Sequence, residues 1–546
     1  MWVRVGAVGL VAFAFGCSDG PRAESETIML STGDGTGPDM SSTAAATTAV
    51  SQSTSGPLGT SGSATSATSS DTTPPIFDVG TVADTPPTPE GPIIPETCEQ
   101  ADGGGSTVGC LFYGVDLDQN RGLENDQFAI AVSNPQMVNA AEVVVEEKVG
   151  GVWQVVDSST VEPQTLHAFP LADKHHQGSG VMAGGTYRVT SDVPIVAYQF
   201  NPLIQGAASS DASLLYPVSS WDSLNRALHW GGGFGRGYLT IVAGFDGTTV
   251  EVVPTVPTEA GTGVPAGTPG VPFSITMDEG DIAEVMVATL NTSLVGSRIE
   301  SDDTDKPIGV FSGHECAWIP HSVTACDHIE DQLSGVRLWG SRFVASRMPV
   351  REPANPEDTL WQIVASEDDT TVTFTADPEV TGVPAGPQVL QAGGVIEFYA
   401  GGTPAHPGDF LVDADKPIAL ANYMTGEGNL SAGTNSGDPA MAQQSPIEQY
   451  LPRYIVLVPS EWINDVLVVT RPTGVAVTLD GVAIDDAEFI DAGGGYEVAR
   501  VPAADGVHAL DSTEGFMVMV VGFDQADSYA YVGGTGTGVI NPNPEG

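Results

Sequence analysis

The chain has 546 residues and a formal net charge of −51, from 18 Lys and Arg against 69 Asp and Glu. This charge excludes nucleic acid and anionic lipid as partners, because both would be repelled. It fits solubility outside the cell, or the binding of cations or basic surfaces.

Residues 1–17 have the layout of a secretory signal, in which Arg4 precedes an apolar run that ends at Gly16-Cys17. The small residue before Cys17 and the polar residues after it are similar to a bacterial lipoprotein signal, which is cut before a cysteine that is then lipidated. We therefore predict an exported protein at the cell surface or outer membrane, anchored by a lipid on Cys17. The alternative is a plain secretory signal, in which Cys17 is lost with the cleaved peptide. No later apolar segment reaches the ~18 residues that a membrane helix needs.

Residues 18–95 consist largely of Ser, Thr, Gly, Ala and Pro. Such a segment cannot bury enough apolar surface to offset the entropy lost on ordering. We predict a disordered tether between the membrane and a head formed by residues 96–546.

Four cysteines follow Cys17, and an even number in an exported protein indicates disulfides. The pairing that closes the shortest loops joins Cys98 to Cys110 and Cys316 to Cys326. The two other connectivities stay open.

The opening of the head carries a calcium candidate. Asp116, Asp118 and Asn120 alternate as the first ligands of an EF-hand loop do. Glycine is missing from the sixth position of this loop, and Gln127 stands where the twelfth position needs glutamate. A structural Ca²⁺ at these residues is one interpretation, and a polar turn after a strand is the other.

The head is predicted to be all-β, because short Val-, Ile-, Thr- and aromatic-rich runs are separated by Gly, Pro, Asn and Asp. One strand recurs at 128–135, 238–244, 361–366 and 466–472, and a closing strand recurs at 191–200, 303–313, 413–424 and 512–523. The closing strands carry Pro194, Pro307 and Pro417, about 110 residues apart. We predict four repeated units, approximately 97–225, 226–335, 336–450 and 451–546. Sandwich-like units are favoured over a propeller-like arrangement, since a propeller blade usually has only roughly 40–45 residues.

The densest group of reactive side chains lies between residues 314 and 330. It consists of His314, Glu315, Cys316, His321, Cys326, Asp327, His328 and Glu330. The spacing of the two cysteines is not C-x₂-C and the compartment is oxidising, which favours a disulfide-stapled loop over a metal site. His314 and His328 are then expected to be polar loop residues.

This loop is one copy of a repeated connection. Each of three closing strands leads into a segment that contains an aspartate, at Asp211, Asp327 and Asp438. The repetition argues against a unique active site. The sequence also contains no G-x-S-x-G, H-E-x-x-H or phosphate-loop motif, so we predict no catalytic residues and no enzymatic activity.

Several segments, in one order over residues 97–534, resemble the IgGFc-binding protein N-terminal domain family. They include GCLFYGVDLDQN (109–120), PIVAYQFNP (194–202), GYLTIVAGFDGTTVEV (237–252), KPIGVFSGHECAWIP (306–320), ACDHIEDQL (325–333) and SYAYVGG (528–534). The resemblance implies a cell-surface or secreted binding module and brings no catalytic residues. Immunoglobulin binding is implied only by the family name, and nothing in this sequence shows it.

We therefore expect a lipid-anchored, surface-displayed adhesion or binding protein whose partner is an extracellular protein, glycoprotein or matrix component. The alternatives are a structural protein of the cell envelope and, from a different class, a secreted metal-dependent hydrolase that uses the 314–330 loop.

Overall fold

The computed structural model describes residues 94–120, 126–203, 209–321, 323, 325–431 and 436–541. The predicted signal, Cys17 and almost all of the predicted tether lie outside these residues. None of the helices in the described ranges is long and apolar enough to cross a membrane.

The all-β prediction is confirmed, and the strands form several curled sheets. The single α-helix of the described ranges, α1, is Cys98–Asp102. The 3₁₀-helices there are η1 (Val218–Ser220), η2 (Val336–Leu338), η3 (Glu427–Asn429), η4 (Ile447–Gln449) and η5 (Asp486–Glu488).

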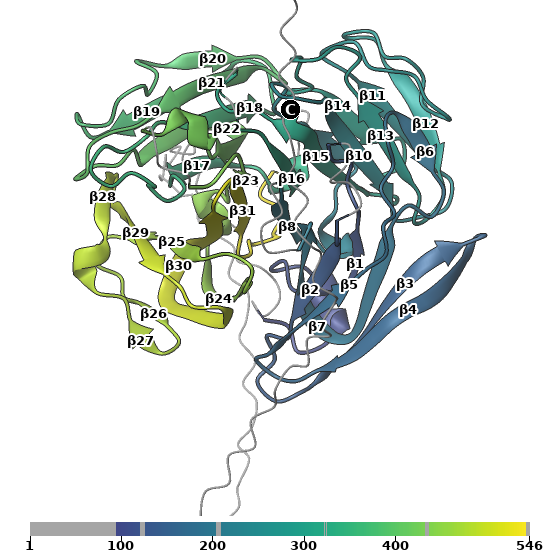
Figure 1. Cartoon of the computed structure of the whole chain (residues 1–546), viewed down its shortest axis with the longest axis horizontal. Coiled ribbons are helices and arrows are strands. Elements are labelled where there is room, and N and C mark those ends of the chain that lie inside the picture. The colour runs from purple at the N-terminus through teal and green to yellow at the C-terminus, as the bar shows by residue number, and fades with distance from the viewer. Residues whose placement is uncertain are drawn as a thin grey trace, which may run out of the picture. The chain divides into compact units, whose positions relative to one another are not determined.

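The strands fall into four consecutive groups, which we call units 1 to 4 (Figure 1). Unit 1 contains β1 (Gly109–Gly114), β2 (Ala129–Ser133), β3 (Ala141–Val149), β4 (Val152–Val161), β5 (Leu166–Pro170), β6 (Gly180–Met182), β7 (Tyr187–Asn201) and β8 (Asp211–Leu215). Unit 2 contains β9 (Leu224–Arg226), β10 (Gly237–Ala243), β11 (Thr248–Val253), β12 (Phe273–Met277), β13 (Ile282–Met286), β14 (Arg298–Ser301), β15 (Ile308–Ala317) and β16 (Asp327–Gln332).

Unit 3 contains β17 (Gly340–Ala345), β18 (Thr359–Ala365), β19 (Thr370–Ala376), β20 (Gln388–Leu390), β21 (Val395–Ala400), β22 (Phe410–Tyr423) and β23 (Met441–Gln443). Unit 4 contains β24 (Leu451–Val458), β25 (Asn464–Pro472), β26 (Val477–Leu479), β27 (Val482–Ala483), β28 (Ile490–Gly493), β29 (Tyr496–Pro502), β30 (Gly506–Asp524) and β31 (Asp527–Val532). The recurring strand of the sequence is β2, β10, β18 and β25.

One long strand organises each of units 1, 3 and 4. In unit 1 the first half of β7 pairs with β1 and β3, and its second half pairs with β2 and β8. β22 and β30 divide their partners in the same way. Pro194 and Pro417 lie near the bend between the halves, where a residue without an N–H is tolerated. Each of these three units is therefore two half-sheets that share a strand.

In unit 2 the long strand is broken into β14 and β15 by the acidic segment 302–307, which ends in Pro307. β14 pairs with β9 and β11, and β15 pairs with β10 and β16, so the division of partners is kept. β6 of unit 1 pairs with β13 and thereby extends a sheet of unit 2.

The last strands of the units, β8, β16, β23 and β31, lie at the centre (Figure 1). β8 contacts β16, β16 contacts β23, β23 contacts β31, and β31 contacts β8. Sandwich-like units are thus arranged around a common axis, which combines the two arrangements considered from the sequence. We call these four strands the inner strands.

Candidate functional site

The described residues contain two disulfides, and both follow the predicted pairing. Cys98–Cys110 joins α1 to β1, and Cys316–Cys326 joins the end of β15 to the segment before β16. A loop of the second size stabilises a protein by roughly 2–3 kcal/mol through restriction of the unfolded chain. Because the two sulfurs of each pair are bonded to each other, neither pair offers thiolates to a metal ion.

The segment with the densest polar side chains is a hairpin and not a loop. His314 lies in β15, His328 and Glu330 lie in β16, and all three are fully buried. The expectation that His314 and His328 are polar loop residues is wrong, because strand pairing continues as far as Ala317 and Asp327.

Buried polar groups in this hairpin pair with one another and with unit 1. His328 Nε2 lies 3.2 Å from Glu330 Oε2, and Gln199 of β7 donates to Glu330 Oε1 at 3.1 Å. His314 Nδ1 accepts the N–H of Cys316 at 3.0 Å. Burial lowers the pKa of His314 to about 3, so its imidazole is neutral at neutral pH.

The axis carries one aspartate from each unit: Asp211, Asp327, Asp438 and Asp527. All four are buried. The repeated connection in the sequence predicted the first three. Asp527 opens DSYAYV, the copy of the same connection in unit 4, and alignment of that segment with the other three would have identified it.

Asp211 ties the inner strands together. Its Oδ1 accepts the N–H groups of Ala212 and Ala530, at 2.9 and 3.1 Å. Its Oδ2 accepts those of Glu330 and Met441, at 3.0 and 3.1 Å. Glu330, Met441 and Ala530 each lie three residues after the axial aspartate of their own unit, so one carboxylate bonds the backbones of all four units.

The other three axial aspartates make fewer hydrogen bonds. Ser210 donates its N–H to Asp327 Oδ1 at 2.6 Å and its hydroxyl to Asp527 Oδ1 at 2.5 Å. Asp438 Oδ1 accepts the N–H of Glu427 at 3.0 Å. Burial raises the pKa of Asp438 to about 6 and that of Asp527 to about 7. Burial and the neighbouring carboxylate of Asp527 raise the pKa of Asp327 as well.

These pKa values predict that the head is more stable at pH 5 than at pH 8. The native state holds protons on Asp438 and Asp527 up to about pH 6 and 7, whereas an unfolded aspartate releases its proton near pH 4. The stabilisation is therefore complete below about pH 4 and is lost as the pH rises to about 7. Melting curves from pH 5 to 8 check this, and Asp527→Asn should show a smaller dependence. A melting temperature that rises with pH over this range would contradict it.

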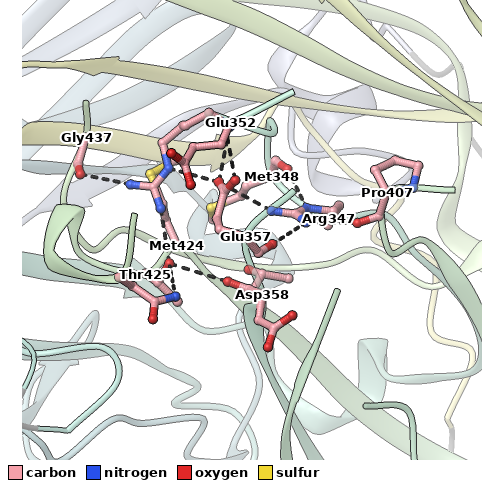
Figure 2. Close-up of polar contacts among 12 residues, drawn as sticks. Arg347, Met348, Glu352, Glu357, Asp358, Pro407, Met424, Thr425 and Gly437 are labelled. Atoms are coloured by element: carbon pink, nitrogen blue, oxygen red, sulfur yellow. Dashed lines mark hydrogen bonds and ion pairs between the residues drawn. The ribbon is translucent and has the colours of Figure 1, made fainter. Parts of the chain in front are cut away.

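A buried ion cluster in unit 3 flanks the axis. Arg347 Nη1 donates to the carbonyl oxygens of Glu357 and Pro407, at 2.6 and 2.8 Å (Figure 2). Arg351 Nε donates to Glu357 Oε1 at 3.1 Å, and its Nη1 donates to the carbonyl of Gly437 at 2.8 Å. Burial alone would raise the pKa of Glu357, but the two guanidinium groups outweigh it and lower that pKa. The cluster fixes the connection that contains Asp438.

The calcium candidates Asp116 and Asp118 accept hydrogen bonds from different backbone N–H groups. Asp116 lies with Asp173 and His175, where one ligand atom from each falls within 4.8 Å of the others. The N–H of Lys174 donates to Asp116 Oδ2 at 2.7 Å, and burial raises the pKa of Asp116 to about 7. Asp118 is fully buried and accepts the N–H of Gly178. Asn120 is half-buried.

The hairpin of β3 and β4 presents an exposed apolar surface. β4 is the outermost strand of its sheet, so its outer backbone edge pairs with no described strand. Val152 and Val155 are each 62% exposed, and Val149 and Val156 are also exposed. Edge strands with apolar side chains are the places at which other chains add to a sheet.

The described residues thus form an all-β head with curled sheets, disulfides and an exposed apolar edge strand. The family described as IgGFc binding protein matches residues 211–522, more than half of the chain. The protein belongs to this family, whose members are binding proteins. The match begins at the axial Asp211 and ends within β30. No curated protein and no solved structure matches the chain.

Proposed function

We propose that the protein is a non-catalytic binding protein, displayed at the cell surface on a lipid anchor, and that its head engages an extracellular protein or glycoprotein. The family match over more than half of the chain carries this proposal. The family name makes the Fc region of an immunoglobulin the first ligand to test. The net charge of −51 adds attraction toward basic protein surfaces.

The β3–β4 hairpin is the proposed contact. An extended ligand segment that lies along β4 would gain backbone hydrogen bonds from the unpaired edge. It would also cover Val152 and Val155, whose exposure otherwise has no packing reason. The backbone hydrogen bonds require a partner that is a polypeptide.

Binding of the purified chain to immobilised Fc and to a panel of extracellular glycoproteins tests the proposal. We expect saturable binding to at least one of these, with dissociation at least tenfold faster for the double variant Val152→Lys/Val155→Lys. Lysine at these positions leaves β4 a strand, but its charge disfavours the addition of another strand to this edge. Sensor-based kinetics measure the rates.

The matched control is Val389→Lys/Val482→Lys, in which two valines that are 62% and 72% exposed in units 3 and 4 are changed. The control should bind as the wild type does. If the chain bound no member of the panel, the result would contradict the proposal of a protein ligand. Equal rates for both double variants would show that the hairpin is not the contact.

The lipid anchor rests on the sequence of residues 1–17. Mass spectrometry of the intact mature chain measures it, since a chain that begins at a lipidated Cys17 differs in mass from one that has lost this residue. If the mature chain begins after Cys17, the protein is secreted and is not anchored by a lipid.

A further inference from the structure

Two carboxylates and an imidazole converge beside the segment that follows β1. Asp116 lies two residues after β1, and Asp173 and His175 lie between β5 and β6. One ligand atom of each residue is within 4.8 Å of those of the other two, and His175 Nδ1 is 2.6 Å from Asp173 Oδ1. Two atoms bound to one zinc ion at about 2.0–2.1 Å lie roughly 3 Å apart, so small side-chain movements bring these groups to that spacing.

Asp116 supplies the buried carboxylate of this group, since the residue is only 3% exposed. In the described part of the chain its Oδ2 accepts one hydrogen bond, from the N–H of Lys174 at 2.7 Å, and its Oδ1 accepts none. A carboxylate in such a place is costly unless it is paired or coordinates a metal ion. One of its oxygen atoms is therefore available to a ligand that the polypeptide does not supply.

Basic side chains do not neutralise the group. Among the described residues, no lysine or arginine forms an ion pair with either of its aspartates. Lys174, which is closest in sequence, directs its ammonium group to Glu147 at 3.0 Å. The charged neighbours outside the group, Asp118 and Glu330, are acidic. The imidazole of His175 is the basic group at this place, and a divalent cation would balance the charge more fully.

The backbone that carries Asp173 and His175 is held in place by the protein itself. The N–H of Leu171 donates to the carbonyl oxygen of Phe128 at 2.9 Å, and the hydroxyl of Tyr187 donates to that of Ala172 at 2.7 Å. The hydrogen bond from Lys174 to Asp116 then fixes the next residues along the chain. Because the ligands are positioned beforehand, little ordering entropy opposes the binding of an ion.

A proton is the alternative to a metal ion. A proton shared by His175 Nδ1 and Asp173 Oδ1 would make an ion pair and would account for the contact between these two residues. It would give Asp116 no further hydrogen bond. A metal ion in place of that proton would contact all three side chains.

We propose that Asp116, Asp173 and His175 form a binding site for a divalent transition-metal ion of the zinc class. The donors are two carboxylate groups and one imidazole. Zn²⁺ accepts both kinds of ligand, with water in a fourth position, whereas Ca²⁺ and Mg²⁺ select sets made of oxygen atoms.

The ion would brace the border between units 1 and 2. It would join the segment after β1 to the segment before β6, and β6 is the strand of unit 1 that pairs with β13 of unit 2. A ligand that binds the folded state alone stabilises it. Binding of the ion should therefore raise the melting temperature of the head.

The test uses the purified chain without a histidine tag, after a chelator has removed divalent ions. Competition with a chromogenic chelator should show one Zn²⁺ bound per chain, and Zn²⁺ should raise the melting temperature. Co²⁺ at the same site should give visible absorption bands that Zn²⁺ abolishes. Ca²⁺ should bind at least tenfold more weakly than Zn²⁺.

Three variants assign the site. His175→Gln and Asp173→Asn change side chains that solvent reaches, so both variants should fold. Each should bind Zn²⁺ at least tenfold more weakly and lose the Co²⁺ bands. Asp157→Asn, which changes an exposed aspartate on β4 of the same unit, should bind as the wild type does. Far-ultraviolet circular dichroism verifies the fold of each variant before titration.

Three results would overturn the proposal. The first is a wild-type chain that neither binds Zn²⁺ nor gains stability from it, which would assign the ion pair of His175 and Asp173. The second is equal affinity for Zn²⁺ in the wild type, His175→Gln and Asp173→Asn, which would place the ion elsewhere. The third is binding of Ca²⁺ as tight as that of Zn²⁺, lost in Asp173→Asn and kept in His175→Gln, which would assign a site made of oxygen atoms.

Discussion

The variant Asp211→Ala is expected to lose most of the stability of the head. Four backbone N–H groups donate to this carboxylate, from Ala212, Glu330, Met441 and Ala530. Alanine would leave all four buried donors without an acceptor, and each buried donor that loses its partner costs roughly 1–3 kcal/mol. The expected loss of about 5 kcal/mol or more is comparable with the whole stability of a typical domain. Soluble yield and the urea midpoint of the purified chain measure it.

A matched control is Asp302→Ala, since Asp302 is an exposed aspartate of unit 2. Its midpoint should stay close to that of the wild type. Asp211→Asn should also be destabilised, because its amide group would direct N–H donors toward two backbone N–H groups. A urea midpoint for Asp211→Ala equal to that of Asp302→Ala would show that the carboxylate does not tie the units together.

The variant Glu357→Ala is expected to be the next most damaging. Arg347 and Arg351 are buried, and Glu357 is the carboxylate that both contact, at 3.5 and 3.1 Å. Removal of one partner from a buried ion pair costs about 3–5 kcal/mol, because the remaining charge is left uncompensated. Chemical unfolding of the purified variant measures this loss.

An exposed pair of the same unit provides the comparison. Arg342 Nε lies 2.9 Å from Asp413 Oδ1, and both side chains are largely in water. Asp413→Ala should therefore cost no more than about 1 kcal/mol. If Glu357→Ala and Asp413→Ala lowered the unfolding free energy equally, the cluster around Glu357 would have to be regarded as solvated.

Much of the fold could be predicted from local pattern. The recurring strand and the closing strand are visible because their apolar residues are nearly continuous, as in β2 and the second half of β7, which are buried on both faces. Pro194 and Pro417 mark the bends of the long strands for a local reason, since proline lacks the N–H that a ladder needs. The arrangement of the units around an axis depends on contacts between residues over 100 positions apart, which no local pattern carries.

The candidate sites were predicted less well for the same reason. His314, His328 and Glu330 have the composition of a solvated loop, and only their enclosure by β10 and unit 1 makes them core residues. Asp116 and Asp118 are two positions apart along the chain, and this spacing does not show which distant residues lie beside either of them. The residues that lie with Asp116, which are Asp173 and His175, come from a distant segment. The buried Arg347 and Arg351 give no signal in a single sequence.

The hydrogen bonds accepted by Asp211 limit how the number of units in this protein could change. Repeat proteins that stack in a line grow or shrink by whole modules, because each module touches only its neighbours. In this head the carboxylate of Asp211 in unit 1 accepts N–H groups from the other three units as well as from its own. The N–H of Thr107 near the start also donates to the carbonyl oxygen of Thr535 near the end. Duplication or deletion of one unit would leave backbone N–H groups at the axis without an acceptor. The hydrogen bonds of one side chain therefore favour four units.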